Sequence, residues 1–226
     1  MIKVRYSFDF DFSIRDLNYS KIFVFRFKNI GIKKECIFDL WYNHSCKRDL
    51  FEKENIMTIA IIYSSCTGNT KKLAETIKDT LKNQNIIYFG KVVENIPEAD
   101  FYLIGSWTNK GQASDDIVHF VKKLKHKKIA YFGTAGYGGS EDYYRTLYER
   151  LKNLIDDSNQ IIGYFYCQGK MPMQVRERYV QMITEHPEDT KLNVSIQNFD
   201  EALSHPDEID LENLRKWINS LSLSKS

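Results

Sequence analysis

The chain has 226 residues, enough for one domain of ordinary size with an appendage. Its formal net charge is +2, so no strong overall field favours nucleic acid or a membrane surface. No run of eighteen apolar residues or secretory signal is present, and the four cysteines lack CxxC or zinc spacing. We therefore expect a cytoplasmic protein with reduced thiols, monomeric and without nucleic-acid or membrane partners.

Residues 1–56 differ in composition from the rest of the chain. Twelve of them are aromatic, and they include no Ala, Thr, Pro or Gln and a single glycine, so the residues that reverse strands are nearly absent. Lys53-Glu54-Asn55-Ile56 can be encoded by a purine-rich stretch placed like a bacterial ribosome-binding site ahead of Met57. We interpret residues 1–56 as a poorly structured extension upstream of a true start at Met57. The alternative is an aromatic docking arm, and the intact mass of the native protein distinguishes the two.

From residue 57 onward, apolar runs alternate with amphipathic helical patterns. The predicted strands span residues 58–63, 86–89, 101–105, 129–133 and 160–167, and the predicted helices between them span 71–81, 115–124 and 143–155. This alternation predicts an α/β fold, a three-layer doubly wound sheet of five parallel strands in the order 2-1-3-4-5. The segment 91–100 is too short for a full crossover helix. Loops are expected at 106–113 and 134–139.

Three further helical patterns follow Cys167, over residues 173–185, 192–203 and 207–221. We predict that residues 168–226 form a helical tail packed on the same domain, which then spans 57–226.

The turn after the first predicted strand has groups suited to an anion, because N–H groups and the dipole at a helix start favour phosphate. The residues that we assign to this site are Ser64, Ser65, Thr67, Gly68, Asn69 and Thr70. The turn lacks the GxxxxGK[ST] pattern of triphosphate sites and the GxGxxG pattern of dinucleotide sites. It therefore predicts a site for a single monophosphate.

Two other kinds of site occupy this position in comparable sheets. A receiver domain needs acidic residues at the ends of the first and third strands, and here those ends are Tyr63-Ser64 and Gly105-Ser106. A low-molecular-weight phosphatase needs a Cys nucleophile and, after five residues, an Arg that clamps the phosphoryl group. Cys66 is present, but the second position is Lys72, which lacks a bidentate fork. A phosphatase-like protein remains a remote alternative.

The segment Ser65-Cys66-Thr67-Gly68-Asn69-Thr70 resembles the [ST]-x-T-G-x-T loop that holds the phosphate of flavin mononucleotide (FMN) in flavodoxins. Two later segments fall where that family places its isoalloxazine-binding loops. The resemblance implies FMN as cofactor, with contacts from Ser106, Trp107, Thr108, Lys110 and Gly111 in the first segment and Gly133, Thr134, Ala135, Gly136, Tyr137, Gly138 and Gly139 in the second.

Within this resemblance, Trp107 is expected to stack on the flavin ring, and the loop at residues 134–139 to offer backbone N–H groups to its N1, O2 and N3 edge. Tyr137, Tyr143 and Tyr144 are rivals for the second ring face. Flavodoxins surround the ring with acidic groups, whereas these segments contain Lys110 and no acid before Glu141. We therefore expect a less negative potential for the second one-electron reduction than is typical of the family.

The tail is similar to that of a clostridial single-domain flavodoxin subgroup, on the stretches Gly163–Pro172, Val175–Tyr179, Asn198–Ala202 and Ser204–Pro206. That subgroup includes the flavodoxin-type partner of bilirubin reductase. The resemblance implies an electron-transfer protein that shuttles between a reductase and an acceptor enzyme, with tetrapyrrole reduction as one candidate role. The alternative is a small NAD(P)H-dependent flavin or quinone reductase on the same fold.

Overall fold

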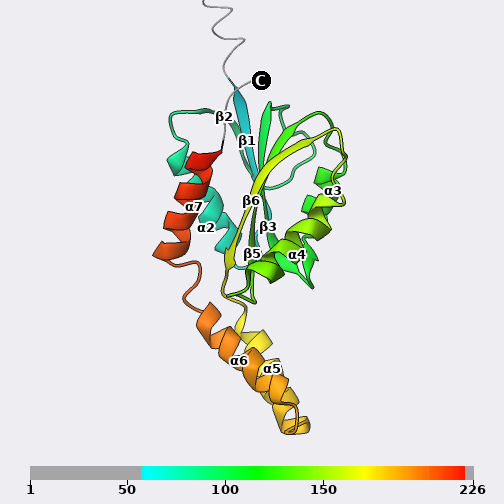
Figure 1. Cartoon of the computed structure of the whole chain (residues 1–226), viewed down its shortest axis with the longest axis vertical. Helices are drawn as coiled ribbons and strands as arrows, with labels where there is room; N and C mark the ends of the chain where they lie inside the picture. The colour runs from blue at the N-terminus through cyan, green and yellow to red at the C-terminus, as the bar shows by residue number, and fades with distance from the viewer. Residues whose placement is uncertain (1–56, 222–226) are drawn as a thin grey trace, which may run out of the picture. The chain divides into compact units, whose positions relative to one another are not determined.

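The computed structural model describes residues 57–221, which form one sheet with helices on both faces (Figure 1). The strands are β1 (Thr58–Tyr63), β2 (Asn85–Gly90), β3 (Phe101–Asn109), β4 (Gln112–Ala113), β5 (Lys128–Ala135) and β6 (Gln160–Gln168). The five long strands are parallel and lie in the order β2-β1-β3-β5-β6, which confirms the predicted doubly wound topology. All five carboxyl ends therefore meet at one edge of the sheet.

The helices are α2 (Asn69–Thr80), α3 (Asp115–Val121), α4 (Glu141–Lys152), α5 (Met173–Glu185), α6 (Thr190–Ala202) and α7 (Glu208–Ser220). Two of them, α2 and α7, cover one face of the sheet and pack against each other. The other face carries α3 and α4. As the sequence suggests, the stretch between β2 and β3 contains no helix.

Alternation along the strands sends successive side chains into two separate cores. In β3, Phe101 and Leu103 join the core under α2 and α7, whereas Tyr102 and Ile104 join the core under α3 and α4. A strand that is buried on both faces is expected to be continuously apolar, as β1 and the first half of β3 are.

The expectation of a loop over residues 106–113 is wrong. β3 continues to Asn109 because Ser106 and Trp107 still pair with Gly133 and Thr134 of β5, which itself extends two residues beyond its predicted end. The chain then turns back into β4 through Lys110 and Gly111. Both turn residues have positive φ, 49° and 80°, which matches the two-residue hairpin turn that suits the twist of the strands.

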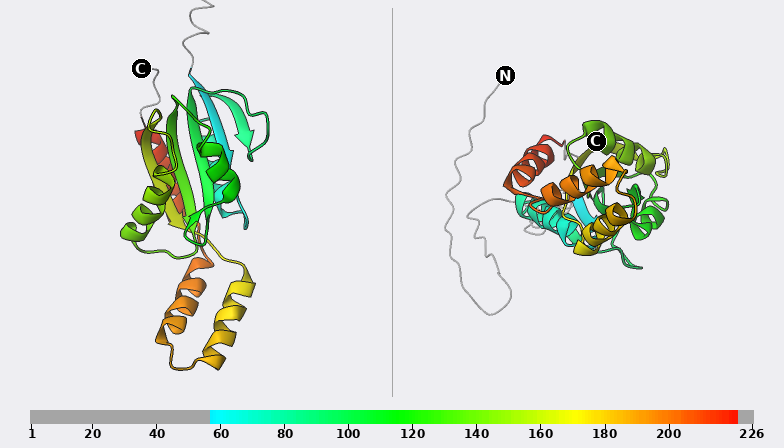
Figure 2. Two further views of the ribbon diagram at one scale, coloured as in Figure 1. Left: turned by 90° about the vertical axis from the view of Figure 1, so that its right-hand side faces the viewer. Right: turned by 90° about the horizontal axis from the view of Figure 1, so that it is seen from below.

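The helices after β6 do not all lie on the sheet. α7 packs on α2 and β6, but α5 and α6 pair with each other as a hairpin beyond the carboxyl edge of the sheet (Figure 2, left). α5 has no buried residue, and Arg176 of α5 forms a two-point ion pair with Asp200 of α6 at 2.7 and 3.1 Å. The chain leaves for this hairpin and returns from it at one place, where Lys170 N–H donates to the carbonyl of His205 at 3.0 Å.

Candidate functional site: the carboxyl edge of the sheet

The loop between β1 and α2 forms a cradle of backbone donors. Gly68, at φ +89°, turns the chain into α2, and a Cβ added there would meet no atom within 4 Å. Among the described residues, no acceptor bonds the backbone N–H groups of residues 66–70. The first turn of α2 carries no acidic side chain that would compete for them. Free N–H groups at a helix start, with open space in front, fit a phosphate group.

The hydroxyl and amide side chains of this loop differ in the hydrogen bonds that they already make within the protein. The Thr70 hydroxyl is fully buried and shares a hydrogen bond of 2.9 Å with the hydroxyl of Thr134, at the end of β5. The amide of Asn69 donates to the Thr67 hydroxyl and to the Lys170 carbonyl, both at 2.8 Å. Asn69 was predicted to contact the phosphate directly, and its side chain instead joins the loop to the base of the helical hairpin. Ser65 accepts from the Lys71 N–H at 3.3 Å.

The phosphatase alternative finds no support at Lys72. Its ammonium group donates to the carbonyl of Pro206 at 2.6 Å, in the turn before α7. A group that must clamp a phosphoryl oxygen has to point into the loop, whereas this one points to another element.

The two sides of β3 separate the residues of the second predicted segment. Trp107 is half-buried and projects from the same face as Leu103, the face that carries α2. Ser106 projects from the opposite face and is fully buried; its hydroxyl lies 3.0 Å from that of Ser114 and accepts the Ser114 N–H at 2.8 Å. The Ser106 side chain, predicted to contact the cofactor, is therefore engaged inside the protein. Thr108 lies on this second face and bonds the hydroxyl of Tyr166.

The turn residues Lys110 and Gly111 lie at the tip of the β3–β4 hairpin. The Gly111 carbonyl accepts from the guanidinium of Arg150 on α4 at 2.7 Å, which ties the tip to the α4 side of the sheet. The Lys110 side chain is exposed.

The third segment runs from the end of β5 into the loop before α4. Gly133, Thr134 and Ala135 belong to the strand and are buried, whereas residues 136–139 form the loop itself. A Cβ on Gly133 would lie 2.2 Å from the ring of Tyr166, so glycine is required there for packing. Thr134 projects toward α2, where its bond to Thr70 joins this segment to the phosphate loop.

The three tyrosines proposed for the second ring face are not equivalent. Tyr144 is buried and stacks on Tyr166, with 5.6 Å between centroids and 9° between planes, and burial raises the pKa of its hydroxyl. It therefore belongs to the core. Tyr143 is half-buried, and Tyr137 is 40% exposed at the tip of the loop. Tyr137 and Tyr143 remain the two candidates.

Two residues that the sequence did not mark as anchors of the third loop are Asn198 on α6 and Gln168 at the end of β6. Both are buried, and both bond the backbone of residues 136–138. The signal available in the sequence was slight: Asn198 is a polar residue beside the apolar positions Leu192, Phe199 and Ala202 of an amphipathic helix.

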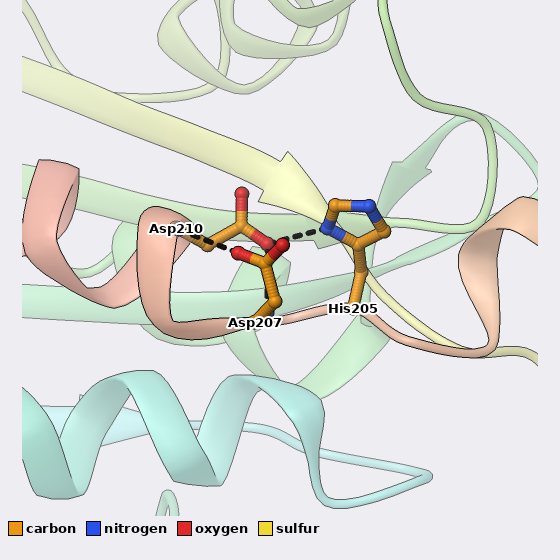
Figure 3. Close-up of side chains that lie close together, drawn as sticks. All are labelled: His205, Asp207 and Asp210. Atoms are coloured by element: carbon orange, nitrogen blue, oxygen red, sulfur yellow. Dashed lines mark hydrogen bonds and ion pairs between the residues drawn. The ribbon is translucent and has the colours of Figure 1, made fainter.

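A cluster of His205, Asp207 and Asp210 lies where the chain enters α7 (Figure 3). Their ligand atoms lie within 4.8 Å of one another, but each carboxylate is already used. Asp210 accepts from the His205 ring at 2.6 Å and from the Asp207 N–H at 2.9 Å, and Asp207 accepts from the Asp210 N–H at 2.9 Å. This is a capping box that satisfies free donors of the helix start.

A cavity of about 640 Å³ opens along the outer edge of β6, between the first turns of α4 and α7. Its lining includes Cys167, Gln168 and Asp210 but no residue of the phosphate loop and not Trp107. Burial raises the pKa of the Cys167 thiol, which packs in the core under α7. No helix in the part of the chain that the structure describes is long and apolar enough to cross a membrane.

Comparison with known proteins agrees with this geometry. The family model described as "Flavodoxin domain" matches residues 60–219. A flavodoxin-like domain-containing protein BilS from Clostridium symbiosum is 33% identical over 181 residues, covering 73% of this chain and 95% of the relative. The protein of the same description from Clostridioides difficile is 29% identical over 177 residues, covering 75% and 99%.

Solved structures with a similar fold are more distant. The Streptococcus pneumoniae TIGR4 flavodoxin is 13% identical, with a TM-score of 0.46 and coverage of 73% of this chain and 97% of that one. Oxidised flavodoxin 2 from Bacillus cereus is 18% identical, with a TM-score of 0.45 and coverage of 72% and 95%. At these values the family assignment rests on the sequence matches.

Proposed function

This chain belongs to the flavodoxin family, whose cofactor is FMN, and from that premise we propose that it carries electrons between a reductase and an acceptor enzyme. The observation that supports FMN binding here is the set of free N–H groups at residues 66–70, next to the Trp107 and Thr134 positions. With its phosphate bound at the start of α2, the FMN molecule would lie along the carboxyl edge of the sheet.

The chain's own residues divide the work of binding. Residues 64–70 hold the phosphate with neutral donors, and Gly68 allows close approach of the backbone. Trp107 covers one ring face and excludes water from it. Tyr137 or Tyr143 covers the other. Bound FMN supplies transfer of one or two electrons, while the protein sets its position and electrostatics.

The charges expected around the flavin ring support a less negative second reduction potential than that of a typical flavodoxin, and so a weaker reductant. Lys110 lies exposed at the tip of the β3–β4 hairpin, and residues 133–139 contain no acid. A nearby positive charge stabilises negative charge that develops on the reduced ring. A potentiometric titration that gives a second potential as low as that of acidic flavodoxins contradicts this assignment.

For the acceptor enzyme we propose a reductase of bilirubin or a related tetrapyrrole. The support for this proposal is the resemblance of the tail to the clostridial subgroup; the two matched relatives are described as flavodoxin-like domain-containing proteins BilS. A test is to mix the reduced protein anaerobically with a bilirubin reductase and bilirubin, which is the electron acceptor: prompt reoxidation of the flavin supports the proposal, and persistence of the reduced spectrum contradicts it.

Purification tests the function as a whole. The protein is expected to be yellow and to release FMN on denaturation, whereas a colourless protein that takes up no added FMN contradicts the proposal. Anaerobic addition of NADH or NADPH alone is expected to leave the oxidised spectrum unchanged. Prompt bleaching would instead assign the chain to the NAD(P)H-dependent flavin or quinone reductases.

A further inference from the structure

A pair of buried amide side chains holds the loop that follows β5. Asn198 donates from Nδ2 to the Gly136 carbonyl at 3.0 Å, and its Oδ1 accepts from the Gly138 N–H at 3.3 Å. Gln168 donates to the same Gly136 carbonyl at 3.2 Å and to Asn198 Oδ1 at 3.1 Å. Both side chains are 9% exposed. Gln168 also donates to the backbone carbonyl of Asn198 at 3.4 Å, so the pair forms a small network that joins the loop to α6.

The loop is pressed against this network. A Cβ on Gly138 would lie 2.4 Å from the Gln168 amide, and a Cβ on Gly136 would lie 2.4 Å from the sulfur of Met171. The start of the segment is fixed as well, by the Thr70–Thr134 hydroxyl bond and by the Gly169 N–H, which donates to the Ala135 carbonyl at 2.9 Å.

The network decides which backbone donors of the loop remain for a ligand. The Gly138 N–H, one of the donors expected from the sequence, already donates to Asn198 and is therefore not available to a ligand. The Gly136 carbonyl is turned toward the amide pair, and in a planar trans peptide the N–H of the next residue points the opposite way. The Tyr137 N–H therefore faces away from the network, and among the described residues it has no acceptor.

We propose that Asn198 and Gln168 are positioning residues for the flavin ring, which makes the α5–α6 hairpin part of the cofactor site. This rests on the proposed function, since it assumes that the loop borders the isoalloxazine of FMN. The pair acts through the loop backbone by orienting the Tyr137 N–H toward the ring edge. In this way α6 of the hairpin, although distant in sequence from the loop, contributes to ring binding.

The position of Tyr137 agrees with this role. Its hydroxyl lies 2.6 Å from that of Ser195, one turn before Asn198 on α6, and its ring meets that of Tyr143 with 6.5 Å between centroids. The same helix therefore fixes both the backbone and the side chain of the loop tip.

The test compares Asn198→Ala with Asn193→Ala, an exposed asparagine on the same helix, in the full chain. Apoprotein of each is titrated with FMN, with riboflavin and with inorganic phosphate. Because the loss is confined to the ring edge, Asn198→Ala is expected to weaken FMN and riboflavin by the same factor, about tenfold. Inorganic phosphate, which occupies residues 64–70, is expected to bind Asn198→Ala as it binds the natural chain. Asn193→Ala is expected to change none of the three affinities.

A second comparison separates positioning from general loss of structure. Since Asn198 and Gln168 share the Gly136 carbonyl and bond each other, the double variant Asn198→Ala/Gln168→Ala is expected to bind riboflavin about as weakly as either single variant. Unchanged riboflavin affinity in Asn198→Ala overturns the proposal. An equal loss for phosphate also overturns it, because the effect then reaches the whole fold. A natural chain that takes up no flavin overturns the proposed function together with this inference.

Discussion

Trp107 stands at the carboxyl end of β3, half-buried, on the face of the sheet that carries α2. If it stacks on the flavin, Trp107→Ala weakens FMN by about tenfold, because an aromatic contact contributes roughly 1 kcal/mol beyond the area that it buries. Trp217 on α7 is the matched control, since its ring packs on that of Phe165 in β6, with 5.8 Å between centroids. Trp217→Ala is expected to leave FMN affinity unchanged in a fluorescence titration. Equal losses in the two variants would contradict the stacking assignment.

The Thr70–Thr134 bond joins the loop after β1 to the end of β5 through buried hydroxyls. Thr70→Val keeps the shape of the side chain but leaves the Thr134 hydroxyl without its partner, so the free energy of unfolding of the apoprotein is expected to fall by about 1–3 kcal/mol. Thr70→Val/Thr134→Val removes both polar groups, and we expect it to recover most of that loss. Urea denaturation measures the natural chain, both single variants and the double variant. A double variant as unstable as the sum of two single variants would show that the hydroxyls do not act as a pair.

Tyr131 provides a pH signature of the core under α3 and α4. Burial raises the pKa of its hydroxyl to about 12, although Tyr166 and Ser106 bond it. In the unfolded chain this hydroxyl ionises near pH 10, so above that pH the unfolded state loses a proton that the folded state keeps. Stability is therefore complete below about pH 10 and declines as the pH rises toward 12. Tyr131→Phe is expected to flatten this decline in denaturation curves taken from pH 8 to 12, and an unchanged slope would contradict it.

At the scale of elements, α5 and α7 have the same length but differ in burial. α5 has no buried residue, whereas α7 buries Leu211, Leu214 and Ile218 against the sheet and α2. Helices with few buried apolar contacts open locally at low cost. In hydrogen exchange we expect the amides of α5 to exchange much faster than those of α7. Equal protection of the two helices would contradict this difference.

The strand and helix order could be predicted from the sequence because buried parallel strands are continuously apolar and their helices are amphipathic. The end of β3 could not, because residues 106–109 lie in a mostly polar stretch and are held as strand by pairing with β5 at residues 106–107 and with β4 at residues 108–109. Local composition does not show such pairing. The same limit applies to α5 and α6, whose amphipathic patterns indicate helices without showing what they pack against.

The part of the candidate site at residues 64–70 could be predicted, because its glycine and helix start are neighbours in the sequence. It was not predictable where contacts join distant segments. The Ser106 hydroxyl is engaged by Ser114 and the Asn69 amide by Lys170, which lies 101 residues away. Asn198 reaches Gly136 across 62 residues. The fold, rather than any motif, brings these groups together.

At the scale of the whole molecule, FMN is expected to stabilise the folded state by mass action. At a free concentration one hundred times its dissociation constant, it adds about 2.7 kcal/mol, which raises Tm by roughly 5–10 °C for a chain of this size. We propose that residues 1–56 are an extension upstream of the true start, so a chain that begins at Met57 is expected to show the same shift. Calorimetry with and without FMN measures both proteins. A smaller shift in the shortened chain would favour the aromatic docking arm.

The α5–α6 hairpin begins and ends at one place at the carboxyl edge of the sheet, which limits how far a change in the hairpin reaches. Because Lys170 and His205 are joined by one hydrogen bond, the hairpin is inserted at a single point, and adding or removing turns at its far end leaves the sheet register untouched. Its near end, by contrast, is bound to the loops through Asn69 and Asn198. The outer turns of the hairpin can therefore change in length without moving the sheet, whereas a change at the inner turn reaches the loops at the carboxyl edge.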